Sequence, residues 1–269
     1  MNLELTNLNA VVCGSTQGIG LATAEVLAKL GANIYLLARN ETKLKQISQR
    51  LDNTKGQVHN YLCIDFQNSG RLEQEIKKIK SPIHILINNT GGPASGKLID
   101  ASLNEFNKAF EMHLINNHIL VQHVVEGMKK EGFGRIVNII STSVKSPIPG
   151  LGVSNTIRAA VANWAKTLSF ELAEHGITVN NVLPGFTDTN RLKTLIDTKS
   201  KTLNKSVEEI TKKMISSVPA NRFGEAAEVA DAIAFLCSPS ASYINGINLP
   251  VDGGRTVSYT HLRAHETKK

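Results

Sequence analysis

The chain has 269 residues, of which 41% are hydrophobic and 20% are charged. This is ordinary globular usage, so the composition excludes a disordered or fibrous chain. No apolar run approaches the roughly 18 residues that a membrane span needs, and the first residues lack the basic and then apolar pattern of a secretory signal. We therefore expect a cytoplasmic protein, not bound to a membrane, whose length suits one domain with a substantial core.

The net charge of +7 comes from basic residues that are spread along the chain. No basic stripe with interleaved aromatic residues is present, so we expect no nucleic-acid partner. The three cysteines, Cys13, Cys63 and Cys237, lie far apart within apolar runs. This spacing favours reduced thiols over disulfides or a metal site, and we predict no metal.

Short apolar runs rich in β-branched residues alternate with longer amphipathic stretches. Strands that are apolar throughout suit a parallel sheet that is covered on both faces. We therefore predict an α/β fold with a doubly wound, mainly parallel, Rossmann-type sheet. The predicted strands are 9–13, 33–38, 58–64, 83–88, 135–140 and 178–182, and the predicted helices are 18–30, 41–51, 69–79, 103–130 and 152–175.

Two segments depart from this alternation. The stretch 190–217 is polar and weakly periodic, and we expect a mobile helical flap beside a substrate pocket, the alternative being a surface excursion without a role. The segment 257–269 changes composition abruptly and has no apolar period, so we predict a non-native tail. The predicted domain is therefore 1–256, with the flap inserted in it.

A strand-to-helix turn near the start of the chain carries three glycines. Glycine allows a tight turn and a close approach of the backbone to a ligand, and the free N–H groups of the helix that follows attract phosphate. We therefore predict that the turn binds the pyrophosphate of a dinucleotide. Its residues are Gly14, Ser15, Thr16, Gln17, Gly18, Ile19 and Gly20.

The GxxxGxG spacing of this turn resembles the short-chain dehydrogenase/reductase family. Further landmarks of that family follow in order, so that the resemblance covers 9–254. It implies a nicotinamide cofactor, a small-molecule substrate, and a homodimer or homotetramer assembled through 103–130 and 152–175. The landmarks are Asp65-Phe66, Asn88-Asn89-Thr90-Gly91, the stretch from Asn181 to Gly185, Arg222-Phe223-Gly224, Glu228-Val229-Ala230 and Asp252-Gly253-Gly254.

The same resemblance assigns further contacts with the cofactor. It implies that Asp65 and Phe66 contact adenine, and that Asn89 and Gly91 line the cleft. The turn after the predicted strand 178–182 would hold the carboxamide and pyrophosphate side through Pro184, Gly185, Thr187 and Thr189.

The choice between the two nicotinamide cofactors depends on the residues that follow the second strand. A carboxylate there would accept a hydrogen bond from a ribose hydroxyl, whereas a cation would pair with the 2′-phosphate of NADP. The residues are Ala38-Arg39-Asn40, with no carboxylate. We predict that Arg39 binds NADP, the alternative being an exposed arginine beside bound NAD.

The catalytic positions depart from the pattern that the resemblance implies, which is a serine, a Tyr-x-x-x-Lys pair and a helix asparagine. Ser141 matches the serine, but Ser154 and Arg158 replace the tyrosine and the lysine, and His113 replaces the asparagine. A serine hydroxyl is a far weaker acid than a phenol, and arginine does not release its proton. The usual proton relay therefore cannot operate unchanged.

Two functions are compatible with this pattern. In the first, the protein is a divergent NADP-dependent oxidoreductase in which Ser141 and Ser154 donate hydrogen bonds, Arg158 contacts ribose and stabilises an oxyanion, and His113, water or the substrate supplies the proton. Within the family, the chain then resembles the 3-oxoacyl-carrier-protein reductases. In the second, the protein binds the dinucleotide without chemistry, as a sensor or oligomer partner. We favour the first because two hydroxyls and a cation stay in register at the carboxyl edge of the predicted sheet, which a mere scaffold would not require.

Overall fold

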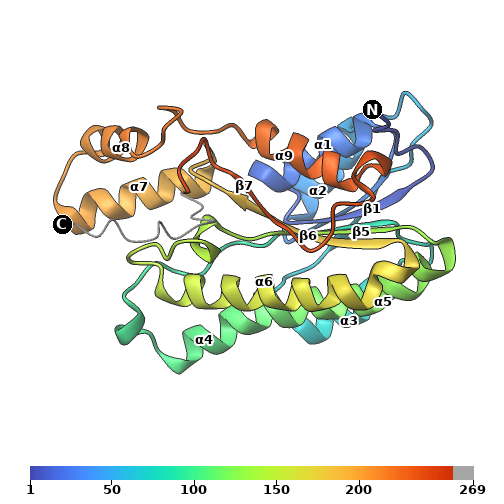
Figure 1. Cartoon of the computed structure of the whole chain (residues 1–269), viewed down its shortest axis with the longest axis horizontal. Coiled ribbons are helices and arrows are strands. Elements are labelled where there is room, and N and C mark those ends of the chain that lie inside the picture. The colour runs from blue at the N-terminus through green and yellow to red at the C-terminus, as the bar shows by residue number, and fades with distance from the viewer. Residues whose placement is uncertain (257–269) are drawn as a thin grey trace, which may run out of the picture.

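Seven parallel strands form one sheet between two layers of helices in the computed structural model, which describes residues 1–256 (Figure 1). The strand order is β3-β2-β1-β4-β5-β6-β7, which confirms the predicted Rossmann-type fold. The strands are β1 (Asn9–Cys13), β2 (Asn33–Ala38), β3 (Asn60–Cys63), β4 (Ile85–Asn88), β5 (Gly134–Ile139), β6 (Ile177–Pro184) and β7 (Asn248–Val251). The helices are α1 (Gly18–Lys29), α2 (Glu41–Arg50), α3 (Ser69–Ile76), α4 (Leu103–Phe110), α5 (Asn116–Glu131), α6 (Gly152–Leu172), α7 (Asn190–Leu203), α8 (Val207–Ser216) and α9 (Ala226–Cys237).

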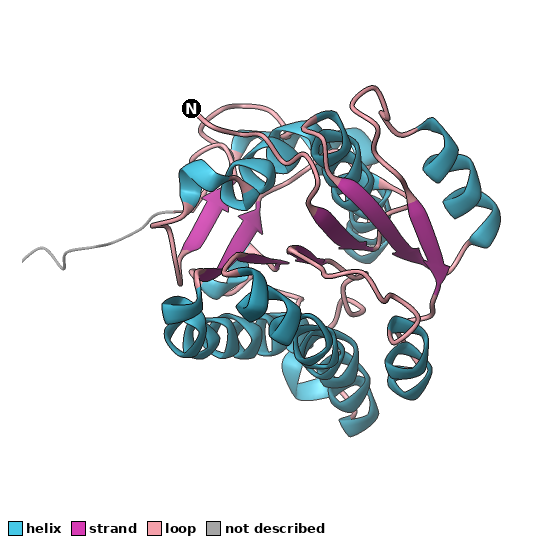
Figure 2. Cartoon of the chain, turned by 90° about the vertical axis from the view of Figure 1, so that its right-hand side faces the viewer, coloured by secondary structure: helices cyan, strands magenta, loops and turns pink. Residues whose placement is uncertain are grey.

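The alternation of side chains along each strand divides the core into two layers, and Figure 2 shows the strands between them. Ala10 and Val12 of β1 face the layer of α1, α2 and α9, whereas Val11 and Cys13 face the layer of α3, α5 and α6. All four side chains are fully buried. Both faces of the sheet are therefore covered, as its apolar strands predicted.

The strand order reverses between β1 and β4, because the chain crosses from β1 toward β3 in one direction and from β4 toward β7 in the other. In an open sheet of parallel strands, ligands bind at such a reversal, beyond the carboxyl ends of the strands. The loops that follow β1, β4, β5 and β6 all open at this edge, and α7 and α8 extend beyond it (Figure 1).

A row of asparagine side chains crosses four strands at one level of the sheet. Asn88 donates to Asn138 at 2.8 Å, Asn138 donates to Asn181 at 2.9 Å, and Asn181 donates to Asn248 at 2.9 Å. The residues are paired in this register along β4, β5, β6 and β7. The row therefore couples the heights at which these strands end, and with them the loops that form the site.

Several element boundaries differ from the predicted ones. Strand β6 continues to Pro184, because its last residues pair with β7, which the apolar pattern did not predict. The predicted helix 103–130 contains a π-helical segment, Glu111–Ile115, between α4 and α5. The predicted flap 190–217 is helical, as α7 and α8, and these meet at Asn204 with a φ of +51°.

The expectations of a protein without membrane spans and of a non-native tail concern the chain as a whole. Within residues 1–256, none of the helices is long and apolar enough to cross a membrane. The predicted non-native tail, 257–269, lies outside the described residues.

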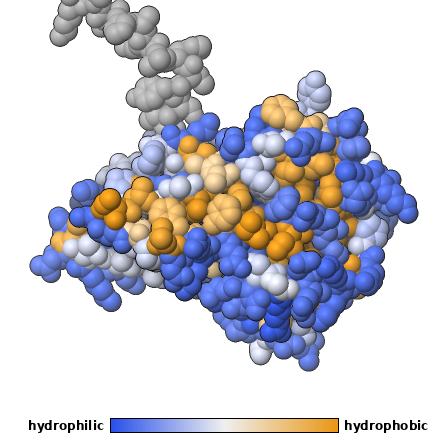
Figure 3. Space-filling view, turned by 90° about the horizontal axis from the view of Figure 1, so that it is seen from below, coloured by the Kyte–Doolittle hydropathy of each residue, from blue (hydrophilic) through white to orange (hydrophobic). Residues whose placement is uncertain are grey.

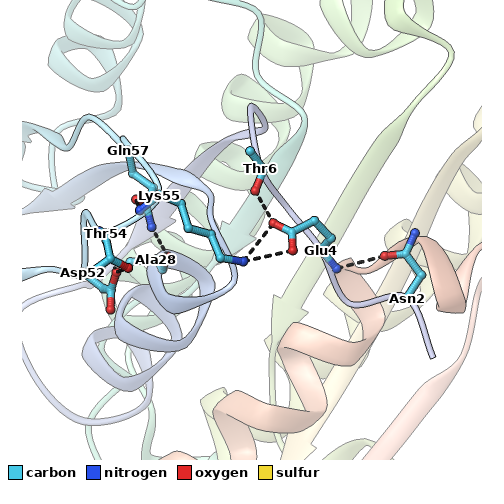
Figure 4. Close-up of polar contacts among 8 residues, drawn as sticks. All are labelled: Asn2, Glu4, Thr6, Ala28, Asp52, Thr54, Lys55 and Gln57. Carbon is cyan, nitrogen blue, oxygen red and sulfur yellow. Dashed lines mark hydrogen bonds and ion pairs between the residues drawn. The ribbon is translucent and has the colours of Figure 1, made fainter.

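The first residues are held to the sheet layer by polar contacts at its amino-terminal side (Figure 4). The Lys55 ammonium binds both carboxylate oxygens of Glu4, at 2.9 and 3.0 Å, and Thr6 also donates to Glu4. Nearby, the buried Gln57 amide donates to the carbonyl oxygen of Ala28 at 2.6 Å. These contacts lie away from the carboxyl edge, so they stabilise the domain without entering the site.

We predict that Asn138→Ala destabilises the protein by about 3 kcal/mol, because it leaves the buried amide nitrogen of Asn88 without its acceptor and the buried amide oxygen of Asn181 without its donor. Urea unfolding followed by circular dichroism measures the change. The exposed Asn53→Ala is the control and should cost little. A loss below about 1 kcal/mol for Asn138→Ala would contradict the importance of the asparagine row.

Candidate active site

The turn between β1 and α1 is packed so closely that it accepts only glycine at two positions. Gly14 has a φ of +60°, and a Cβ atom on it would lie 2.7 Å from the carbonyl oxygen of Asn89. A Cβ atom on Gly20 would lie 2.3 Å from the carbonyl oxygen of Gly14. Real atoms do not approach this closely, so a side chain at either position would force the turn away from β4.

The N-terminus of α1 is left available by this turn. Gln17 at the N-cap does not cap the helix, since its side chain accepts no N–H of α1 and instead accepts the Asn190 amide at 3.5 Å. The first N–H groups of the helix therefore point toward the mouth of β1 without a side-chain cap, which is the arrangement that binds phosphate. Ser15 is buried and donates to the carbonyl oxygen of Leu37 at 3.4 Å, which fixes the turn to β2. Thr16 and Ile19 are partly buried.

The end of β4 forms the floor of the predicted cleft. The Asn89 amide donates to the carbonyl oxygens of Cys13 and Gly14, at 3.2 and 3.4 Å. Gly91 is exposed, and a Cβ atom on it would meet nothing within 4 Å. Asn89 therefore joins the two strands at the reversal point, and Gly91 borders open space.

The residues predicted for the adenine side lie beyond β2 and β3. Arg39 is exposed, and Asn40 after it caps α2 by accepting the N–H of Lys43 at 2.9 Å, so no carboxylate occupies this turn. Asp65 is exposed and accepts the N–H of Gln67 at 3.0 Å. The side chain of Phe66 is buried in the core and its carbonyl oxygen accepts the Asn116 amide at 2.6 Å, which leaves its N–H for any contact with adenine.

The opposite wall comes from the chain after β6. The N–H of Gly185 donates to Val251 at 2.9 Å, just beyond Pro184. Thr187 is buried, and Thr189 caps α7 by accepting the N–H of Leu192 at 3.5 Å. A Cβ atom on Gly18 would lie 3.2 Å from the Thr189 methyl carbon. The structure therefore brings Thr189 directly against the glycine turn, across the cleft.

The predicted catalytic residues lie around the carboxyl end of β5. Ser141 follows this strand by two residues, and its hydroxyl accepts the N–H of Ser143 at 3.1 Å. Ser154 is partly buried in the first turn of α6. Arg158, one turn later, is buried and donates to the carbonyl oxygen of Ile139 at 3.0 Å. Within residues 1–256, no hydrogen bond joins Ser141, Ser154 and Arg158 to one another.

His113 lies in the π-helical segment and is 1% exposed. Its Nδ1 atom forms a hydrogen bond of 2.7 Å with the hydroxyl of Thr90, whereas its Nε2 atom has no partner among the described residues. Burial, together with the charge of Arg158, lowers the pKa of His113 to about 2. The imidazole is therefore neutral near pH 7, which favours a hydrogen-bonding role over the proton donation considered from the sequence.

Two residues of this region were given no role from the sequence, although Thr90 belongs to one of its landmarks. Thr90 holds His113, and its place between Asn89 and Gly91 was the available signal. Arg191, in the first turn of α7, donates to the carbonyl oxygen of Pro93 at 2.8 Å and so crosses the cleft from the flap to the β4 loop. Its only signal was its position two residues after Thr189.

The chain is similar to known proteins over nearly its whole length. A family model described as Enoyl-(Acyl carrier protein) reductase matches residues 14–256. The 3-oxoacyl-[acyl-carrier-protein] reductase FabG of Haemophilus influenzae is 36% identical over 250 residues, which cover 93% of this chain and 98% of that protein.

Solved structures agree with this match. L-sorbose reductase from Gluconobacter frateurii, complexed with NADPH and L-sorbose, superposes with a TM-score of 0.89 at 27% identity, covering 96% of this chain and 100% of that one. YwfH, an NADPH-dependent reductase involved in bacilysin biosynthesis, superposes with a TM-score of 0.87 at 28% identity, covering 94% of this chain and 100% of that one. The resemblance expected from the sequence is confirmed, and the chain belongs to the short-chain dehydrogenase/reductase family.

Proposed function

We propose that the protein is an NADP-dependent oxidoreductase that interconverts a carbonyl and an alcohol on a small molecule. The observation that carries the proposal is the glycine turn with its uncapped helix N-terminus, which opens at the same edge as Ser141 and Arg158. The names of FabG, L-sorbose reductase and YwfH, all reductases, give independent support. The exposed Arg39 and the absence of a carboxylate beside it support NADP over NAD.

The residues present fit a dinucleotide. The turn from Gly14 to Gly20 would hold the pyrophosphate, with Thr189 opposite it, and Arg39 would pair with the 2′-phosphate. Asn89, Gly91 and the backbone after Asp65 would line the remaining length of the cofactor. When bound as NADPH, the cofactor supplies the hydride that adds to the carbonyl carbon.

The chain's own residues would act on the carbonyl oxygen. The hydroxyls of Ser141 and Ser154 would donate hydrogen bonds to it, and the guanidinium of Arg158 would stabilise the negative charge that develops there. Because Arg158 keeps its proton and His113 is neutral, the oxygen would take its proton from water. In this proposal, a permanent cation stands where the family's Tyr-x-x-x-Lys pair would donate a proton. The stabilisation of the developing oxyanion is retained.

We further propose that the chain acts as a homodimer or homotetramer in the cytoplasm. Seen from below, the face of α3 to α6 carries a band of apolar surface (Figure 3). Among the apolar side chains of these helices, Leu103 of α4 and Phe170 of α6 are 82% and 73% exposed. Contiguous apolar surface of this kind is typical of protein interfaces. The cysteines at positions 13, 63 and 237 are free, which suits a reducing compartment.

The cofactor proposal predicts that Arg39→Ala raises the Kd for NADPH about tenfold or more and leaves that for NADH nearly unchanged, because only NADPH carries the 2′-phosphate. Fluorescence titration of the nicotinamide measures both constants. Arg50→Ala, which removes an exposed cation paired with Glu25, is the control. Equal affinity of the native protein for NADPH and NADH would contradict the role of Arg39.

The catalytic proposal predicts that Arg158→Ala lowers kcat about 100- to 1000-fold, because the developing oxyanion loses its cation. The absorbance of NADPH follows turnover on a panel of ketones, sugars, oxo acids and 3-oxoacyl thioesters. Arg158→Lys keeps a cation and should retain part of the activity. NADPH binding by the native protein without turnover on any member would instead favour the non-catalytic dinucleotide-binding protein.

The assembly proposal predicts that Phe170→Glu dissociates the oligomer, because it places a charge in the apolar band. Sedimentation velocity measures the mass. Val58→Glu, at a 63% exposed position outside this face, should leave the oligomer intact. A native protein that sediments as a monomer at micromolar concentration would overturn the proposal.

A further inference from the structure

Two guanidinium groups from different elements converge on the loop after β4. Nη2 and Nε of Arg191, from α7, would lie 3.5 and 3.8 Å from a Cβ atom on Gly92, and Nη2 of Arg158, from α6, would lie 3.9 Å from the same point. Because Gly92 has no side chain, nothing of its own separates the two cations. The loop thus leaves an open position flanked by two positive charges.

Neither guanidinium has an acidic partner within residues 1–256. Arg158 donates to the carbonyl oxygen of Ile139 and Arg191 to that of Pro93, and both accepting groups are neutral. Burial, and then the charge of Arg191, lowers the pKa of Arg158 to about 10. A buried cation without a counter-ion is costly, and a second cation beside it adds to the cost. An anion between them would offset both the cost of burying Arg158 and the repulsion between the two cations.

The pair lies where a substrate would meet the reacting centre. Arg158 binds the carbonyl oxygen of Ile139, two residues before Ser141. Arg191 begins the flap two residues after Thr189, which contacts the glycine turn. Burial, and then the charge of Arg158, lowers the pKa of His113, whose buried Nε2 atom has no partner among the described residues. The anion would therefore bind within a few bonds of the carbonyl group.

We propose that Arg191, together with Arg158, binds a carboxylate of the substrate, and that the protein acts on short oxo acids and the corresponding hydroxy acids. This inference rests on the proposed function and narrows its substrate class. Two guanidinium groups match a carboxylate well, because each can donate two parallel hydrogen bonds to it. A 3-oxoacyl thioester has no charge next to its carbonyl group and would leave the pair uncompensated.

The phosphates of the cofactor are weaker candidates for this position. The glycine turn and the N-terminus of α1 already provide a place for the pyrophosphate, and Arg39 provides one for the 2′-phosphate. Arg191 instead reaches away from the turn to Pro93, on the loop after β4. If the pair binds a substrate carboxylate, Arg191→Ala weakens the recognition of acids. If it binds a cofactor phosphate, Arg191→Ala lowers the affinity for the cofactor.

The experiment compares 2-oxo and 3-oxo acids with their methyl esters and with neutral N-acetylcysteamine thioesters. For the native protein we expect kcat/KM to favour the acid over its ester about 10- to 100-fold. Arg191→Ala should abolish this preference, mainly through KM, while the Kd for NADPH changes less than about threefold. Arg191→Lys should restore part of it. Lys193→Ala, which removes a cation exposed on the same helix, should keep the native preference.

Calorimetry gives a readout that does not need turnover. The protein loaded with NADP⁺ cannot reduce an oxo acid, so binding is measured directly, and we expect Arg191→Ala to weaken it about tenfold or more. Acid and ester that are reduced equally well would overturn the carboxylate site and leave the oxidoreductase proposal intact. Carboxylate binding without any turnover would support the carboxylate site and contradict the oxidoreductase proposal. A large loss of NADPH affinity in Arg191→Ala, with acid preference unchanged, would assign Arg191 to the cofactor.

Discussion

The close contact between the β1–α1 turn and Asn89 is the constraint on which the rest of the site depends. The backbone of Gly14 fills the space against Asn89, and Gly20 in turn packs on the carbonyl of Gly14. This packing brings the N-terminus of α1 to the point where the strand order reverses. Because the asparagine row couples the ends of β4 to β7, the turn also determines where Ser141 and the flap stand relative to a bound dinucleotide.

Around this frame, the site that we propose relies on a different chemistry from that of the family's usual pair. A tyrosine and lysine pair moves a proton, whereas Ser154 and the buried Arg158 offer a hydroxyl and a charge that does not leave. A permanent cation in a buried position also affects its neighbours, because burial and, after it, the charge of Arg158 lower the pKa of His113. The altered residues are thus mutually consistent. A site built around a fixed positive charge favours negative charge, both the charge that develops on a substrate oxygen and the charge that a substrate brings with it.

Much of the fold could be predicted, because its signals are local. Strands such as Asn9–Cys13 and Asn33–Ala38 are short apolar runs, and the helices between them repeat their apolar residues at helical spacing. Elements at the margin of the sheet were harder to predict from the sequence. Strand β7 contains a proline and is only partly buried, so its pattern is weak, and the extension of β6 to Pro184 follows from pairing with it. The π-helical segment around His113 has no periodic signal of its own.

The amino-acid sequence by itself determined the glycine turn that we propose for the cofactor and the serine and arginine that we propose for catalysis, because Gly14, Gly18 and Gly20 are close neighbours and Ser154 and Arg158 are one helical turn apart. The tertiary structure alone decided which distant residues meet. Arg191 and Arg158 come from helices joined through β6, and they approach each other only because the flap folds back over Gly92. Asn88, Asn138, Asn181 and Asn248 form a row only because their strands share one register. Contacts of this kind depend on strand order and crossover direction, and no local pattern records them.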